Sequence, residues 1–142
     1  MKNNNLGKLM AIILVAIVLA AGAAAFVVLK VNGEEESKGP SIDEVLEASV
    51  DVPEITTNLA TDDFIRISFK IQTDSKDAKE ELEKRDFQVR NIIIQELSEK
   101  KSEDLQSSSG KAALEGNLKD KINTLMQEGK IVRVYITGSL LQ

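Results

Sequence analysis

The sequence predicts one membrane-spanning helix followed by a small α+β domain with the element order strand, strand, helix, helix, strand. Three patterns predict this class. An unbroken apolar run without any charge lies near the N-terminus, at residues 9–29. Beyond residue 50, segments in which apolar and polar residues alternate flank two segments whose apolar residues recur with a helical period. That order favours helices packed on one face of a small sheet.

The apolar run from Leu9 to Leu29 is long enough to cross a bilayer, since a helix of that length measures ~30 Å. A cleaved secretory signal peptide is the alternative, because Lys2 and Lys8 precede the run and residues 21–25 form small-residue triplets that suit cleavage. The apolar sequence continues past these triplets to Lys30, which exceeds the usual length of a signal peptide core. We therefore favour an uncleaved anchor.

Small residues recur at every fourth position within this helix, at Ala16, Ala20 and Ala24. Such a stripe lets another helix approach closely, so these alanines form a candidate helix-packing face. The alternative interpretation is that alanine is simply frequent in membrane helices. Basic residues on the two sides of the apolar run nearly balance, and they do not determine the orientation of the helix.

Residues 30–49 are interpreted as a tether, because "NGEEESKGPS" is polar and punctuated by glycine and proline. Within it, "SIDEVLEA" is predicted to form a short helix. Ser41 would cap this helix, and Glu44 stands three residues later in the spacing of a capping box. The domain itself is placed at residues 50–142.

A β-hairpin is predicted at the start of the domain, from Glu54–Ala60 and Phe64–Ile71 with a turn at "ATDD". The second of these strands alternates clearly. Its apolar face carries Ile65, Ile67, Phe69 and Ile71, and its polar face carries Arg66, Ser68 and Lys70. One face of the hairpin should therefore be buried.

A long amphipathic helix is predicted from Asp77 to about Lys100, after the capping segment Thr73–Ser75. Its apolar stripe consists of Ala78, Leu82, Val89, Ile93 and Leu97, widened by Phe87, Arg90 and Ile94. The charged run "KEELEKRD" on the other side is interpreted as a solvated face.

Arg90 lies beside this stripe, between Val89 and Ile93. The simplest interpretation is that its aliphatic stem covers apolar surface while the guanidinium group reaches water. The alternatives are a buried ion pair or a contact with a neighbouring subunit, because arginine suits planar pairing with carboxylates at interfaces. Arg90 is therefore the candidate subunit or ion-pair contact.

A second helix should begin after Ser108 or Ser109 and stop at Gly129. Its apolar stripe consists of Ala112, Leu114, Leu118, Ile122, Leu125 and Met126. The final segment "KIVRVYITGSLL" alternates and predicts a third strand. One face of that strand should carry Val132, Val134 and Ile136, and the other Arg133, Tyr135 and Thr137.

The composition excludes several functions. All 23 acidic residues lie beyond the apolar run and the net charge is −5, so a nucleic acid is a poor partner. Without histidine or cysteine, the chain lacks the usual general base, the thiolate nucleophile and the common transition-metal ligands. Gly110-Lys111 fails the phosphate-loop pattern, since Leu105 and Ala112 stand where glycine and serine or threonine are required. We expect no catalytic residue, cofactor or metal.

The order of these features resembles the flagellar basal body-associated FliL family over nearly the whole chain. The matching segments are "NLATDDFIRISFKIQ", "VRNIIIQELSEKKSEDL", "GKAALEGNLKDKIN" and "VRVYITGSLLQ". Arg90 and Asn58 fall at positions that match family motifs. Ile136 departs from the pattern, because the family often has an aromatic residue there.

The resemblance implies a single-pass protein of the bacterial cytoplasmic membrane, with residues 1–8 in the cytoplasm and the domain outside. It implies partners as well: membrane lipid, the ion-driven flagellar stator proteins and further copies of the same chain in a ring. The implied fold of the outer domain is similar to the stomatin/prohibitin-like (SPFH) fold. A generic membrane-tethered or secreted binding module is the alternative function.

Overall fold

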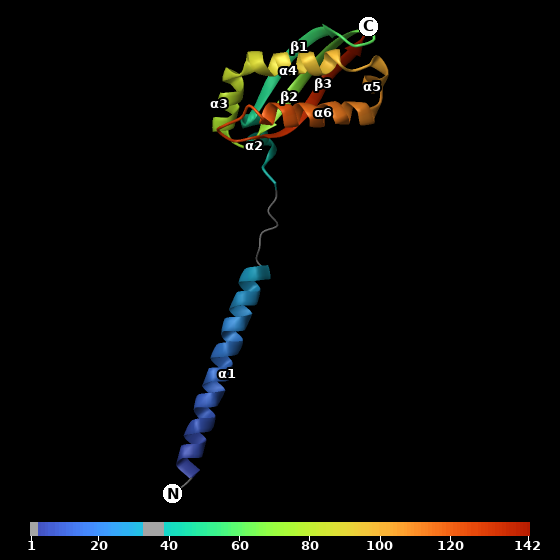
Figure 1. Cartoon of the computed structure of the whole chain (residues 1–142). Helices are drawn as coiled ribbons and strands as arrows, with labels where there is room; N and C mark the ends of the chain where they lie inside the picture. The colour runs from blue at the N-terminus through green and yellow to red at the C-terminus, as the bar shows by residue number, and fades with distance from the viewer. Residues whose placement is uncertain (1–2, 33–38) are drawn as a thin grey trace. The chain divides into compact units, whose positions relative to one another are not determined.

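The computed structural model describes residues 3–32 and 39–142. An antiparallel sheet with the strand order β1-β2-β3 forms the framework of the C-terminal part of the chain (Figure 1). The strands are β1 (Ser49–Asn58), β2 (Phe64–Thr73) and β3 (Ile131–Leu141). The predicted hairpin is confirmed: β1 pairs with β2, and the Leu59 N–H donates to the Asp63 carbonyl at 2.8 Å across the turn. The predicted third strand is confirmed as well.

The central strand β2 buries the apolar face that its alternation predicts. Ile65, Ile67, Phe69 and Ile71 are each at most 1% exposed. The opposite face carries charged side chains, which pair across the hairpin. Arg66 contacts Glu54 at 2.7 Å, and Lys70 contacts Asp51 at 2.8 Å. The sheet therefore has one dry face and one solvated face, as is usual for antiparallel sheets with helices on one side.

The face assignment of β3 is partly wrong. Ile131 and Val134 are buried at 1%, whereas Val132 is 39% exposed. The register explains the difference, because Thr73 pairs with Ile131 while the preceding Gln72 pairs with Arg133. Val132 is thus the extra residue of a β-bulge, and a bulge reverses the alternation on either side of it.

Helices α4 (Asp86–Ser98) and α6 (Ser108–Asn123) lie side by side across the dry face of the sheet (Figure 1). Helices α3 (Lys76–Lys84) and α5 (Ser102–Gln106) precede them. The architecture is therefore α+β, as predicted. The Ser107 hydroxyl caps α6 by accepting from the Gly110 N–H at 3.0 Å, one residue before the predicted caps. Gly110 itself is needed for close packing, since a Cβ there would lie 1.5 Å from the Asp104 carbonyl oxygen.

The single helix predicted from Asp77 to Lys100 is wrong, because it breaks at Arg85, which has φ −94° and ψ 13°. The stripe of Ala78, Leu82, Val89, Ile93 and Leu97 is nevertheless buried as predicted. Leu82 and Val89 are two helical turns apart, so the apolar period runs through the break without a change of phase. The hydrophobic pattern could not reveal the break.

The predicted stop of α6 at Gly129 is also wrong, since the helix ends at Asn123. Leu114, Leu118 and Ile122 are buried as expected, but Ala112 is exposed. Gly129 has a different role in the connection to β3. It adopts φ +138°, and a Cβ there would lie 2.5 Å from the Asp74 carboxylate. This backbone conformation favours glycine.

The two compact units of the chain are residues 1–39 and 40–142. The first contains α1 (Asn3–Asn32), in which Asn5–Val28 is long and apolar enough to cross a membrane. The second begins with α2 (Ile42–Glu47), which the Ser41–Glu44 capping box starts as predicted. The Thr73 N–H donates to the Ala48 carbonyl at 2.9 Å and ties this helix to the sheet, so α2 belongs to the same compact unit, Pro40–Gln142. Residues 33–38 of the predicted tether lie outside the described residues.

A buried carboxylate joins the two long helices. The Glu96 side chain on α4 is 3% exposed, and its carboxylate pairs with Lys100 at 3.0 Å and with Lys121 of α6. Asn117 of α6 donates to the same carboxylate at 3.2 Å. Burial raises the pKa of Glu96, but hydrogen bonds from Lys121 and Lys100 outweigh burial and hold that pKa below its ordinary value.

Glu96→Ala should lower the free energy of unfolding by about 3–5 kcal/mol, because it removes one partner of a buried ion cluster. Glu83→Ala, which removes an exposed carboxylate from α3, is the matched control and should change it by less than about 0.5 kcal/mol. The lowered pKa makes the Glu96 contribution complete above the ordinary carboxyl pKa of 4.5 and lost as the pH falls below it. Urea unfolding of the full chain in nonionic detergent measures both effects, and equal losses in the two variants would contradict the assignment.

Candidate functional site

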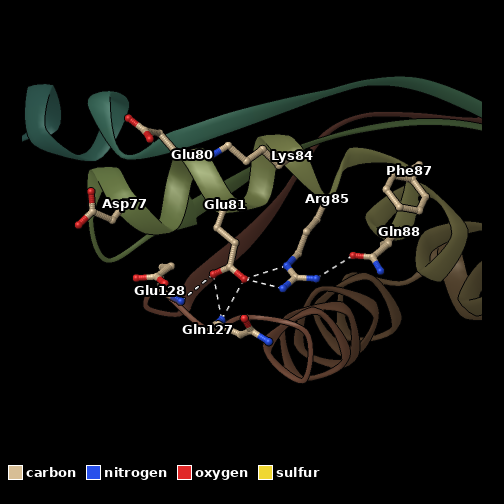
Figure 2. Close-up of a pocket in the computed structure, with 9 residues that line it drawn as sticks. All are labelled: Asp77, Glu80, Glu81, Lys84, Arg85, Phe87, Gln88, Gln127 and Glu128. Atoms are coloured by element: carbon tan, nitrogen blue, oxygen red, sulfur yellow. Dashed lines mark hydrogen bonds and ion pairs between the residues drawn. The ribbon is translucent and has the colours of Figure 1, made fainter.

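A groove of about 640 Å³ lies between α3, the start of α4 and the segment that connects α6 to β3 (Figure 2). Its walls come from parts of the chain that are far apart in sequence. The lining residues are Asp77, Glu80, Glu81, Lys84, Arg85, Phe87, Gln88, Gln127 and Glu128. Most of them are charged or amidic.

Glu81 fastens the two walls of the groove together. Its carboxylate accepts hydrogen bonds from the backbone N–H groups of Gln127 at 2.9 Å and Glu128 at 2.7 Å (Figure 2). Arg85 donates to the same carboxylate at 2.8 Å through Nε, and its Nη1 donates to Gln88 at 3.0 Å. This chain of hydrogen bonds spans the break between α3 and α4, so it holds the groove in shape.

The environment of Glu81 favours its charged form. The backbone hydrogen bonds from Glu128 and Gln127 lower the pKa of the carboxyl, desolvation opposes them in part, and the hydrogen bond and charge of Arg85 lower it further. A carboxylate that is already saturated with donors and ionised at neutral pH is not poised to transfer a proton. We assign Glu81 a structural role.

The remaining charges of the groove are not neutralised in this way. Within the described residues 40–142 of the second unit, Asp77, Glu80 and Glu128 have no ion-pair partner, and neither does Lys84. Across the same described residues, no group of three or more carboxylates is placed to hold a metal ion. The groove thus presents an excess of exposed negative charge without a metal-binding cluster in the described chain.

Phe87 stands at the rim of the groove and is 71% exposed. It also lines an adjoining hollow of about 260 Å³, together with Gln88, Asn91, Ile92 and Leu125. The prediction that Phe87 widens the buried stripe is therefore wrong, and so is that for Ile94, which is 42% exposed. Phe87 and Ile94 are seven positions apart and lie on a second side of α4, which we call its outer face.

Arg90 lies on this outer face. Its Nε donates to Asp86 at 2.8 Å, one helical turn earlier, and the two side chains are 35% and 55% exposed. The pair is therefore a surface pair and not a buried one. Exposed pairs of this kind contribute at most about 1 kcal/mol to stability.

The alanines singled out in the apolar helix lie on one side of α1, since successive members of the set are about 40° apart around the helix axis. Ala16, Ala20 and Ala24 are all exposed within their unit. Their role as a packing face stays a prediction.

Glu81, Arg85 and Glu96 are functional or structural residues that the sequence analysis missed. The first two belong to the run interpreted as a solvated face. A signal was nevertheless present, because Glu81 lies three positions after buried Ala78, and Glu96 lies three positions after buried Ile93. Charged residues at such positions border the core and need partners.

A helix able to span a membrane, a small α+β domain and an open, charged groove are together typical of a membrane-anchored accessory protein. Comparison with known proteins then identifies the family. The family model described as flagellar basal body-associated protein FliL matches residues 49–142. This chain belongs to the flagellar basal body-associated FliL family.

Two relatives support this assignment. The chain is 49% identical to the flagellar protein FliL of Bacillus subtilis (strain 168) over 123 residues, which cover 87% of this chain and 88% of that protein. It is 31% identical to the flagellar protein FliL of Aquifex aeolicus (strain VF5) over 93 residues, which cover 63% of this chain and 58% of that protein. The family consists of flagellar accessory proteins, and its flagellar location fits the apolar helix α1.

Glu81→Gln should weaken the attachment of the α6–β3 connection, because the amide keeps one acceptor oxygen but loses the charge. Since the pKa of Glu81 is lowered in the folded state, its contribution to stability is complete above pH 4.5 and is lost as the pH falls through the lowered pKa. The variant should therefore be less stable than the native chain at pH 7, and the difference should vanish as the pH falls through the lowered pKa of Glu81.

Urea unfolding over a series of pH values from 7 downward tests this expectation. Glu80→Gln, which removes the neighbouring exposed charge, is the control and should match the native chain at pH 7. A Glu81→Gln chain that is as stable as the native one at pH 7 would show that the charge of Glu81 contributes nothing to the attachment of the connection.

Proposed function

We propose that this chain is a single-pass protein of the bacterial cytoplasmic membrane that associates with flagellar stator units and supports flagellar rotation. Residues 1–8 lie in the cytoplasm, α1 spans the bilayer in contact with lipid, and the α+β domain lies outside. Several copies form a ring, in which the domain has a fold similar to the stomatin/prohibitin-like (SPFH) fold. Membership of the FliL family is the observation that carries this proposal.

The surface of the domain supports assembly through side chains. A ring needs a heterologous interface, in which two different patches of the same chain meet. Exposed apolar residues occur at separate places, on the outer face of α4 and near the sheet end, where Phe64 is 49% and Leu140 is 50% exposed. Tethering to one membrane raises the effective concentration of the domains, so weak contacts suffice.

The edges of the sheet are poor candidates for that interface. On β3, the Asn123 side chain pairs with both backbone groups of Ile131, at 2.7 and 3.2 Å, and Glu115 accepts from the Ile136 N–H at 2.9 Å. On β1, Pro53 lies at a break in the register. Blocked, bulged and proline-containing edges resist pairing with another strand. Side-chain surfaces are therefore the favoured contacts.

The proposed mechanism is mechanical. A collar of anchored domains that binds one stator conformation better than another shifts the population toward that conformation. The domain needs no chemical step for this role. It needs only a fixed position at the membrane and a partner-binding surface.

Deletion of the gene should impair motility most strongly under high load, and chemical crosslinking in intact membranes should join this chain to a stator protein. Normal motility at high load together with no stator crosslink would reject the proposal. Intact-mass analysis of the same sample addresses the alternative of a secreted binding module, which predicts a species that begins near Phe26.

Arg90→Ala should fold normally but fail to assemble if Arg90 contacts a neighbouring subunit. The surface pair with Asp86 limits the loss in unfolding free energy to less than about 1 kcal/mol. Arg66→Ala is the matched control, because Arg66 also forms an exposed pair, with Glu54 at 2.7 Å. Sedimentation of the full chain in nanodiscs measures assembly, and an Arg90→Ala chain that assembles like the control would reject the subunit contact.

A further inference from the structure

The groove and its neighbouring hollow form one continuous surface with two different halves. They share Phe87 and Gln88. The half near α3 carries the carboxylates of Asp77, Glu80 and Glu128. The other half is lined by Ile92 and Leu125, both partly buried, and by the exposed Phe87 ring between the two. A ligand that fills both halves must itself carry positive charge next to apolar groups.

The shape of this surface is set before any partner arrives. Glu81 ties the backbone of Gln127 and Glu128 to α3, and Arg85 continues the connection to Gln88 on α4 (Figure 2). Glu81 and Arg85 pair with each other in this framework, so their charges are not available to a ligand. A preformed surface binds with a smaller loss of conformational entropy than a mobile one.

The unpaired charges of the groove determine which sign of charge a partner must carry. Three carboxylates without ion pairs in the described chain face one such cation, Lys84. The net charge of −5 over the whole chain acts in the same direction at longer range. An exposed aromatic ring adds a site for a cationic head, since Lys and Arg are attracted to the face of Phe. The excess negative charge of the groove disfavours anionic lipid and phosphate.

We infer that the groove formed by α3, the start of α4 and the α6–β3 connection docks a basic, apolar polypeptide segment of a partner protein. The basic side chains of this segment meet Asp77, Glu80 and Glu128, and its apolar side chains pack on Phe87, Ile92 and Leu125. The inference deepens the proposed function and rests on it for the location of the partner at the flagellar motor. It names the chemistry by which the partner is recognised.

A pair of synthetic amphipathic peptides tests the inference. Both carry leucine at the same positions, and the charged positions hold lysine in one peptide and glutamate in the other. The full chain, labelled with ¹⁵N, is placed in nanodiscs of phosphatidylcholine, whose surface has no net charge to attract the cationic peptide. NMR titration up to about 1 mM detects even weak binding.

The lysine peptide should shift the amide signals of the groove, and its affinity should fall as salt is added, because exposed charges are screened. Phe87→Ala and the double variant Glu80→Lys, Glu128→Lys should each weaken binding about tenfold or more. Glu103→Lys reverses an exposed charge on α5, outside the groove, and should leave the affinity unchanged. Phe87 is largely exposed, so its replacement should not disturb the core.

Several outcomes would overturn the inference: no binding of the lysine peptide by the native chain, equal binding of the glutamate peptide, or equal effects of the groove variants and Glu103→Lys. If the native chain binds no peptide and the groove variants lose self-association, the groove binds a second copy of the chain and the partner segment is rejected.

The outcome also separates this inference from the proposed function. Peptide binding in the groove combined with normal motility in the deletion strain would leave the groove assignment standing and reject the motor role. Impaired motility in the deletion strain, combined with normal swimming of the Phe87→Ala strain and no peptide binding, would reject the groove alone.

Discussion

The burial of one face of β2 under α4 and α6 is the interaction on which the rest of the domain depends. Its alternating isoleucines and Phe69 are at most 1% exposed, and both helices contribute their own apolar stripes against them. Because burial of an apolar side chain contributes about 1.5–3 kcal/mol, this central layer outweighs any surface ion pair. The positions of the groove walls and of the outer face of α4 follow from how the helices pack on this strand.

Polar contacts then determine how the helices lie relative to one another. Apolar packing tolerates small shifts, whereas a buried carboxylate requires its partners at fixed positions. Glu96 joins α4 to α6 in the core, and Glu81 joins α3 to the connection that follows α6. The two carboxylates have different roles. Glu96 stabilises the interior, and Glu81 shapes a surface that stays accessible. Accessory proteins that act by binding need such a stable surface more than a reactive one.

The alternation of β2 and the helical stripes of α4 and α6 were sufficient to predict the elements and most of the core. The predictions from the sequence were wrong where the hydrophobic period carries no information about the backbone. Leu82 and Val89 keep the same phase with or without the break at Arg85, and the bulge at Val132 changes the face of its neighbours without changing the composition. Phe87 was predicted to widen the buried stripe, but it lies on the outer face of α4 and is 71% exposed. The groove could not be predicted, because it brings together residues near 80 and near 128, which are far apart in the sequence.

The sequence by itself determined the apolar helix, the class of the domain, the buried face of β2, the main apolar stripes of the helices and the absence of histidine and cysteine chemistry. These properties depend on composition and on local periodicity, which the chain carries before it folds. The tertiary structure alone decided which charged residues matter. Glu81 and Glu80 are neighbours in the same charged run, yet one is fixed by the Gln127 and Glu128 backbone and the other remains exposed in the groove. The physical reason is that the pKa and pairing of a charge depend on groups brought close in space, whatever their separation along the chain.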